Sequence, residues 1–235
     1  MIGRPVALVS FALVLGASAR IAAQTPPAAP TTGRPHGVEV GVGLEWLGGF
    51  DIGSATALLP RNPATGSEPF TLFHSDGRQG AAAAFGATIG FNISQVVAVE
   101  AFGSMGKPTI RLAITQDPER SGPIEVSDNS LTEYALGGSL LVHWPRLTIA
   151  HRVVPFLLVG AGFFWQVAPD TSFETGHLIH IGGGARYVLV ARPTRRLSAV
   201  GLRGDVRLIA RDGGLGLDQR RRISANAGAA LFVAF

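Results

Sequence analysis

Charged side chains at alternate positions are the residues of this chain whose types and spacing suggest chemistry. Arg203, Asp205 and Arg207 occupy every second position of one segment. Successive side chains of an extended strand point to opposite faces, so these three would share a face. Carboxylates and guanidinium groups that face one another away from water must pair and hydrogen-bond to remain ionised. The candidate network contains Glu39, Glu45, Glu100, Glu133, Asp205, Arg186, Arg203 and Arg207.

Other constellations of reactive residue types are weaker. His177 and His180 lie three positions apart with Glu174 nearby, a spacing that suits a metal site on a helix. On a strand the same spacing puts the two histidines on opposite faces, which predicts His177 at a rim and His180 in an interior. The triplet Gly182-Gly183-Gly184 precedes no helix, so close packing explains it better than phosphate binding. The chain has no Cys, which excludes disulfides and thiol catalysis, and we expect no cofactor.

The elements that position the charges are best seen in the last thirteen residues, Ile223 to Phe235. One parity of this segment is apolar throughout, and the other is mostly small or polar. A period of two predicts a strand with two different faces. A long strand that is apolar on one side suits a wall between lipid and a filled interior. The apolar parity holds Ile223, Ala225, Ala227, Ala229, Leu231, Val233 and Phe235.

Seven more alternating segments precede this one, so we predict an all-β chain that forms an eight-stranded antiparallel up-and-down transmembrane β-barrel. The connections 50–79 and 107–129 are predicted to be long loops, and the turns on the opposite side are short. Long loops outside the cell and short turns inside are typical of outer-membrane barrels. The predicted strands span 37–49, 80–92, 96–106, 130–143, 153–166, 177–190, 197–210 and 223–235.

Aromatic residues of the lipid-facing parity gather at the two predicted rims, as expected for belts at the membrane–water interfaces. A soluble barrel would instead place its apolar parity inside. The outer belt is predicted to contain Trp46, Phe85, Tyr134 and Trp165, and the periplasmic belt Phe91, Tyr187 and Phe235.

The first residues predict export from the cytoplasm. Residues 1–23 combine Arg4, an apolar run and small residues before Gln24, which is typical of a secretory signal peptide. Residues 24–36 are predicted to be a Pro-rich periplasmic linker, and 37–235 the barrel domain. After the N-terminus no stretch of about 20 apolar residues occurs, so a helical membrane protein is not expected.

The basic balance of the chain does not indicate a nucleic-acid partner. Its formal net charge of +4 falls to +2 once Arg4 and Arg20 leave with the signal peptide. Lys107 is the only Lys, and no basic stripe alternates with stacking aromatics. The run Arg220-Arg221-Arg222 is interpreted as the end of a loop before the last strand.

Four segments carry a resemblance to a known family. These segments resemble OmpA/OmpX-type eight-stranded outer-membrane proteins. They are the Phe-terminated last strand, Val-Pro-Phe-Leu-Leu-Val-Gly-Ala-Gly at 154–162, Gly-Gly-Gly-Ala-Arg-Tyr at 182–187 and Leu-Arg-Gly-Asp-Val-Arg at 202–207. The resemblance covers roughly residues 37–235. It implies a location in the cell outer membrane, contacts with membrane lipid and lipopolysaccharide, and assembly by the barrel-assembly machinery through the C-terminal strand. We expect no counterpart of the family's peptidoglycan-binding domain.

Three functions are compatible with this barrel. The first is a non-enzymatic structural, envelope or surface-interaction role, with the lumen closed by the Glu/Asp–Arg network and with loops that meet an unidentified ligand. The second is a small ion pore or transporter, because the charged, Gly-rich lumen leaves room for water. The third is a lipid A-modifying enzyme, which would need a His-x-Ser pair with a carboxylate. Gly182 follows His180 at that spacing and Ile179 follows His177, so we predict that the chain is not an enzyme.

Overall fold

The computed structural model describes residues 37–59, 70–115, 122–128, 131–147, 149, 152–168, 173–191, 197–218 and 220–235. The predicted signal peptide and linker therefore lie outside the described residues. Within the described part of the chain no helix is long and apolar enough to cross a membrane. A single 3-10 turn, η1 (Pro145–Leu147), interrupts the strands there.

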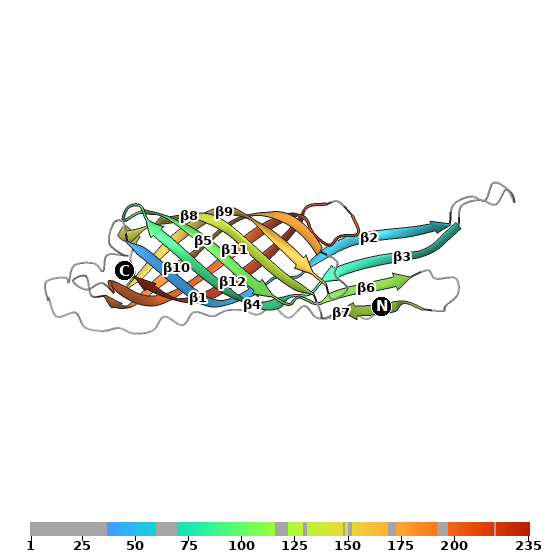
Figure 1. The fold of residues 1–235 in the computed structure, drawn as a ribbon, viewed down its shortest axis with the longest axis horizontal. Coiled ribbons are helices and arrows are strands. Elements are labelled where there is room, and N and C mark those ends of the chain that lie inside the picture. Colours follow the sequence, from blue (N-terminus) through green and yellow to red (C-terminus); the bar gives the residue numbers. More distant parts are fainter. Residues whose placement is uncertain are drawn as a thin grey trace.

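Eight strands close into a barrel, and every neighbouring pair is antiparallel (Figure 1). Closure is completed by the pairing of the first barrel strand with the last, which removes both free edges. The eight-stranded barrel predicted from the alternating pattern is thus confirmed. Its strands are β1 (Val38–Leu47), β4 (Ala82–Asn92), β5 (Val97–Gly106), β8 (Thr132–His143), β9 (Val153–Val167), β10 (Phe173–Ala191), β11 (Ala199–Gly213) and β12 (Arg222–Ala234).

The prediction that 50–79 and 107–129 are long loops was wrong. Most of their described residues form a second, four-stranded sheet in the order β2-β3-β6-β7, which projects from one end of the barrel (Figure 1). The prolines that favoured a loop, Pro60, Pro63 and Pro69, all lie in 60–69, outside the described residues. The flanking segments have the branched and aromatic residues that suit strands. The strands of this projecting sheet are β2 (Phe50–Leu59), β3 (Phe70–Gln79), β6 (Ile110–Thr115) and β7 (Ile124–Asp128).

Two barrel strands extend beyond their predicted bounds toward the projecting sheet. β10 begins at Phe173 rather than 177, and β11 continues to Gly213 rather than 210. The extra residues pair with one another, for example Gly176 with Gly213. Gly213 and Gly214 follow with positive φ angles of 86° and 77°, a conformation that glycine adopts without steric cost and that ends the strand.

The two parities of the barrel strands separate apolar from polar side chains. The outward side chains of the wall are large, apolar and exposed, such as Val42, Val206 and Leu208. The inward side chains are buried and include most of the charged groups of the barrel strands. The C-terminus lies at the barrel end opposite the projecting sheet, where Phe235 N donates to Val38 O at 2.8 Å (Figure 1). The fold therefore gathers charged side chains from β1, β5, β8, β10, β11 and β12 in one narrow lumen.

Candidate functional site: a closed, ion-paired lumen

β11 carries the centre of the lumen network. Arg203 contacts Glu100 on β5, and its Nε lies 3.1 Å from Oδ2 of Asp205. The guanidinium group also lies over the Phe156 ring, 4.8 Å from its centroid. All three charged side chains are at most 7% exposed. A buried guanidinium with two carboxylates and an aromatic face has partners for both its charge and its plane.

Arg207 continues the network four residues after Arg203 on β11. Its Nε donates to Oδ1 of Asp205 at 2.6 Å, and its Nη1 lies 4.0 Å from Oε1 of Glu45. Asp205 therefore bridges two arginines of its own strand. Phe102 lies beneath Arg207, with 5.8 Å between the guanidinium carbon and the ring centroid. Glu45 is the most accessible acid of this group, with 18% of its side chain exposed.

Arg186 and Glu39 form a separate pair near the barrel end that carries the C-terminus. Their side chains are 4% and 5% exposed, and Nη2 of Arg186 contacts Oε1 of Glu39. The guanidinium group lies 5.0 Å from the ring centroid of Phe232 on β12. The repeated combination of a carboxylate and a phenyl ring shows how the narrow barrel accommodates each arginine.

Glu133 pairs with Arg211, a residue that the sequence analysis missed. Nη1 of Arg211 lies 2.6 Å from Oε1 of Glu133, and both side chains are 3% exposed. Gln166 donates to the other oxygen of Glu133 at 2.8 Å, and Gln79 donates to it at 3.2 Å. Arg211 lies four residues after Arg207, and an even spacing on a strand places both side chains on the same face. The predicted strand, however, ended at 210. Gln79 was not predicted to face the lumen, because it falls in the predicted loop 50–79.

A further arginine closes the barrel end beneath the projecting sheet. Arg222, interpreted from the sequence as a loop residue, is the first residue of β12 and is buried. Its Nη2 donates to Ile52 O and to Asp218 O, each at 2.9 Å, and lies 3.0 Å from Oδ1 of Asp218. The same loop reaches β2 through Leu217 N, which donates to Ile52 O at 2.8 Å. These contacts tie the loop and β2 to the mouth of the barrel.

The lumen is packed rather than open at the level of Arg207. The cavity beside Glu45 and Arg207 has a volume of about 20 Å³, room for about one water molecule. Most inward glycines are tightly enclosed: a Cβ on Gly184 would lie 2.1 Å from Gly204 O. A Cβ on the outward Gly138 would meet its nearest atom at 3.7 Å. The inward glycines therefore let backbone and arginine side chains fill the interior, and this arrangement can hold charges but provides no wide path.

The two histidines occupy opposite faces of β10. His177 is exposed, whereas His180 is buried and its Nε2 lies 3.1 Å from Oγ of Ser139. Phe102 packs edge-on against the His180 ring, with 5.2 Å between centroids. Among the described residues no group of three His, Cys, Asp or Glu side chains is placed to hold a metal ion. The Ser–His pair was not predicted, because its members lie on separate strands.

The aromatic residues of the predicted belts lie near the two ends of the barrel wall. Phe85, Met105, Tyr134 and Trp165 follow one another in cross-strand register on β4, β5, β8 and β9. Tyr134 and Trp165 stack, with their ring centroids 6.5 Å apart. Trp46 is exposed on β1 one row further toward the projecting sheet, paired with Ala83.

The remaining aromatics of this set lie at the other end. Phe91 pairs with Val38 on β1, and Val38 O accepts the hydrogen bond from Phe235 N. Tyr187 pairs with Val153 at the start of β9. All three aromatic side chains are 37–49% exposed on the outer wall.

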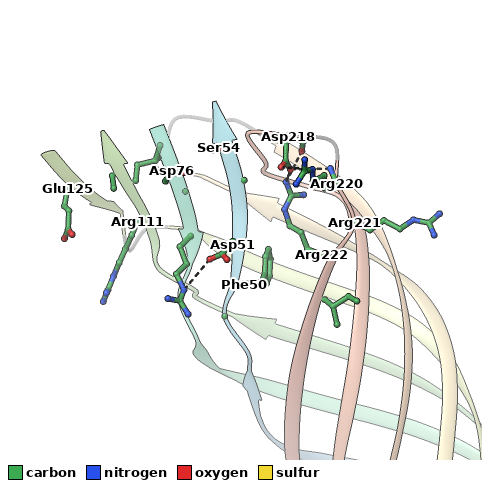
Figure 2. Close-up of a pocket in the computed structure, with 17 residues that line it drawn as sticks. Phe50, Asp51, Ser54, Asp76, Arg111, Glu125, Asp218, Arg220, Arg221 and Arg222 are labelled. Atoms are coloured by element: carbon green, nitrogen blue, oxygen red, sulfur yellow. Dashed lines mark hydrogen bonds and ion pairs between the residues drawn. The ribbon is translucent and has the colours of Figure 1, made fainter. Parts of the chain in front are cut away.

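A groove of about 930 Å³ lies outside the lumen, between the base of the projecting sheet and the segment before β12 (Figure 2). Arginines come from both sides of it, as Figure 2 shows for Arg111 on the sheet and Arg221 near β12. The arginines that line it are Arg78, Arg111, Arg220, Arg221 and Arg222. The carboxylates that line it are Asp51, Asp76, Glu125 and Asp218. The surface around the barrel mouth is therefore densely charged, with one more positive group than negative.

Comparison with known proteins does not assign the chain to a family. No family model matches the chain. No curated protein matches it at a significant level either.

Proposed function

We propose that this chain is an integral outer-membrane β-barrel protein of the OmpA/OmpX type, with a closed lumen and a structural or surface-interaction role. The observation that carries the proposal is the inversion of the barrel wall, which is apolar outside and charged inside. A soluble barrel buries its apolar parity, whereas a membrane barrel turns it toward lipid. Exposed outward residues in the wall include Val42, Leu44, Ile89, Leu136, Leu140, Leu157, Val159, Ile179, Ile181, Leu202, Val206, Leu208 and Leu231.

The extent of this apolar surface supports a lipid environment. The exposed side chains come from all eight barrel strands and so surround the barrel. Soluble monomers rarely expose contiguous apolar patches beyond a few hundred Å². On this proposal, the outer side of the barrel contacts membrane lipid and lipopolysaccharide, and the C-terminal strand is what the barrel-assembly machinery would bind.

The filled lumen favours the structural role over the pore. Arg203, Arg207 and Arg211 each hold a buried carboxylate, and the cavity beside Arg207 has room for about one water molecule. The network stiffens the barrel and leaves recognition to the projecting sheet. For the Ser139–His180 pair we propose a packing role, because both side chains are buried inside the lumen.

Reconstitution into lipid vesicles tests both halves of this proposal. We expect the folded protein to float with the vesicles in a density gradient and to produce no single-channel steps in planar bilayers. Flotation with regular conductance steps that change in Arg207→Ala would favour the pore. A protein that stays in the aqueous fraction would contradict membrane insertion.

A further inference from the structure

Two arginines lie side by side on neighbouring strands of the projecting sheet. Arg78 on β3 and Arg111 on β6 are direct register partners. Both side chains are exposed, and both line the groove outside the barrel mouth. Like charges placed directly opposite on a sheet destabilise the strand pair. This juxtaposition therefore costs the fold stability, and an external anion between the two groups would offset that cost.

Asp51, Asp76 and Glu125 line the same part of the groove, and of these only Asp51 forms an ion pair with either arginine. Asp51 is the register neighbour of Arg78, but its Oδ1 lies 3.8 Å from the Nε, and the two side chains are 85% and 70% exposed. An exposed pair with this geometry contributes little. Within the described residues Arg111 has no ion pair, and its neighbour on β7 is the neutral Ser127. Glu125 belongs to the next row of the sheet, opposite Ala113.

The two arginines lie just outside one end of the barrel wall. They lie at the base of the projecting sheet, where Gly80 N donates to Thr109 O at 2.7 Å just beyond the barrel. Lys107, the only Lys of the chain, is exposed directly after β5. The aromatic row that contains Phe85 and Met105 lies on β4 and β5, the barrel strands next to β3 and β6 in the chain.

We propose that Arg78 and Arg111 bind a phosphate group of a phosphorylated glycolipid in the outer leaflet. A guanidinium group presents a planar fork that binds two phosphate oxygens, so two arginines side by side can bind one phosphate together. Lys107 adds charge at the same level, and basic side chains near a membrane surface attract anionic head groups. This inference rests on the proposed function, because an outer-membrane barrel carries this rim at the surface of the outer leaflet.

Binding of bisphosphorylated lipid A to the purified barrel in neutral detergent tests the site, for example by titration calorimetry. We expect the double variant Arg78→Gln/Arg111→Gln to bind on the order of 30-fold more weakly than the unmodified protein. Arg152→Gln is the matched control, since Arg152 is exposed in a turn at the opposite end of the barrel. It should leave the affinity unchanged, and added salt should weaken binding to the unmodified protein.

Two further probes identify what the arginines bind. Dephosphorylated lipid should bind the unmodified protein as weakly as lipid A binds the double variant. Inorganic phosphate alone should bind far more weakly than lipid A, and equal affinity would overturn the assignment to a lipid. Full affinity in the double variant, or an equal loss in Arg152→Gln, would overturn the site itself.

Flotation of the double variant separates this inference from the proposed function. A variant that still floats with vesicles but binds lipid A with full affinity refutes the phosphate site alone. An unmodified protein that fails to float refutes the membrane proposal, and the phosphate site with it.

Discussion

Replacing Arg203 with Leu is expected to lower the free energy of unfolding of the barrel by about 3–5 kcal/mol. Arg203 is the partner of Glu100, and both side chains are at most 4% exposed. Without the guanidinium group, Glu100 would keep a buried charge with no cation beside it. Asp205 would keep one cationic partner, because Nε of Arg207 still lies 2.6 Å from its Oδ1. Urea unfolding of the protein in lipid vesicles, followed by Trp fluorescence, measures the change.

A double substitution and a surface control identify the cause of this loss. Glu100→Gln/Arg203→Leu also removes the unpaired carboxylate charge of Glu100. The double variant should therefore recover part of the stability that Arg203→Leu loses. Arg152→Leu, in an exposed turn, should change stability by less than about 0.5 kcal/mol. If Arg203→Leu were as harmless as Arg152→Leu, the lumen network would not support the barrel.

Placing a charge on the outer wall should destabilise the barrel only when that wall faces lipid. Val206 is the middle residue of β11 and is 57% exposed on the outside. Val206→Arg should cost about 2–4 kcal/mol in vesicles, because an arginine at the bilayer midplane loses its hydration. Leu58 on β2 is 58% exposed on the projecting sheet and provides the matched position. Leu58→Arg should stay within about 0.5 kcal/mol.

The comparison of these two positions is informative because their exposure is nearly the same. A water-exposed wall would tolerate arginine at both positions equally. Equal effects of Val206→Arg and Leu58→Arg on the urea midpoint would therefore contradict a lipid-facing wall. A loss confined to Val206→Arg would place the boundary between lipid and water below the projecting sheet.

The barrel strands were predictable because each carries a complete signal of its own. Alternation over ten or more residues fixes both the strand and its two faces, as Ile223 to Phe235 illustrates. The parity argument also indicated which charges share the interior. Their partners did not follow from it, because strand tilt and register decide which side chains meet. Asp205, for example, contacts arginines of its own strand, and Glu39 contacts Arg186 from a distant one.

The projecting sheet was missed for a different physical reason. Proline and glycine in 50–79 dominated the interpretation, although β2 and β3 pair along most of their length on either side of 60–69. On the proposed function, a strand that leaves the barrel has no lipid on one face, so its alternation is less regular. The same error hid Gln79, which lies 1% exposed in the network around Glu133. Strand ends also shifted by a few residues, and this shift excluded Arg211.

We propose above all that the chain forms a closed barrel in the outer membrane. The most direct measurement is cell fractionation followed by detergent electrophoresis of the outer-membrane fraction, with and without boiling. We expect the protein in that fraction, with a band that resists cold detergent and shifts its migration on boiling. Protein recovered in the soluble periplasmic fraction, with the same migration before and after boiling, would contradict the account.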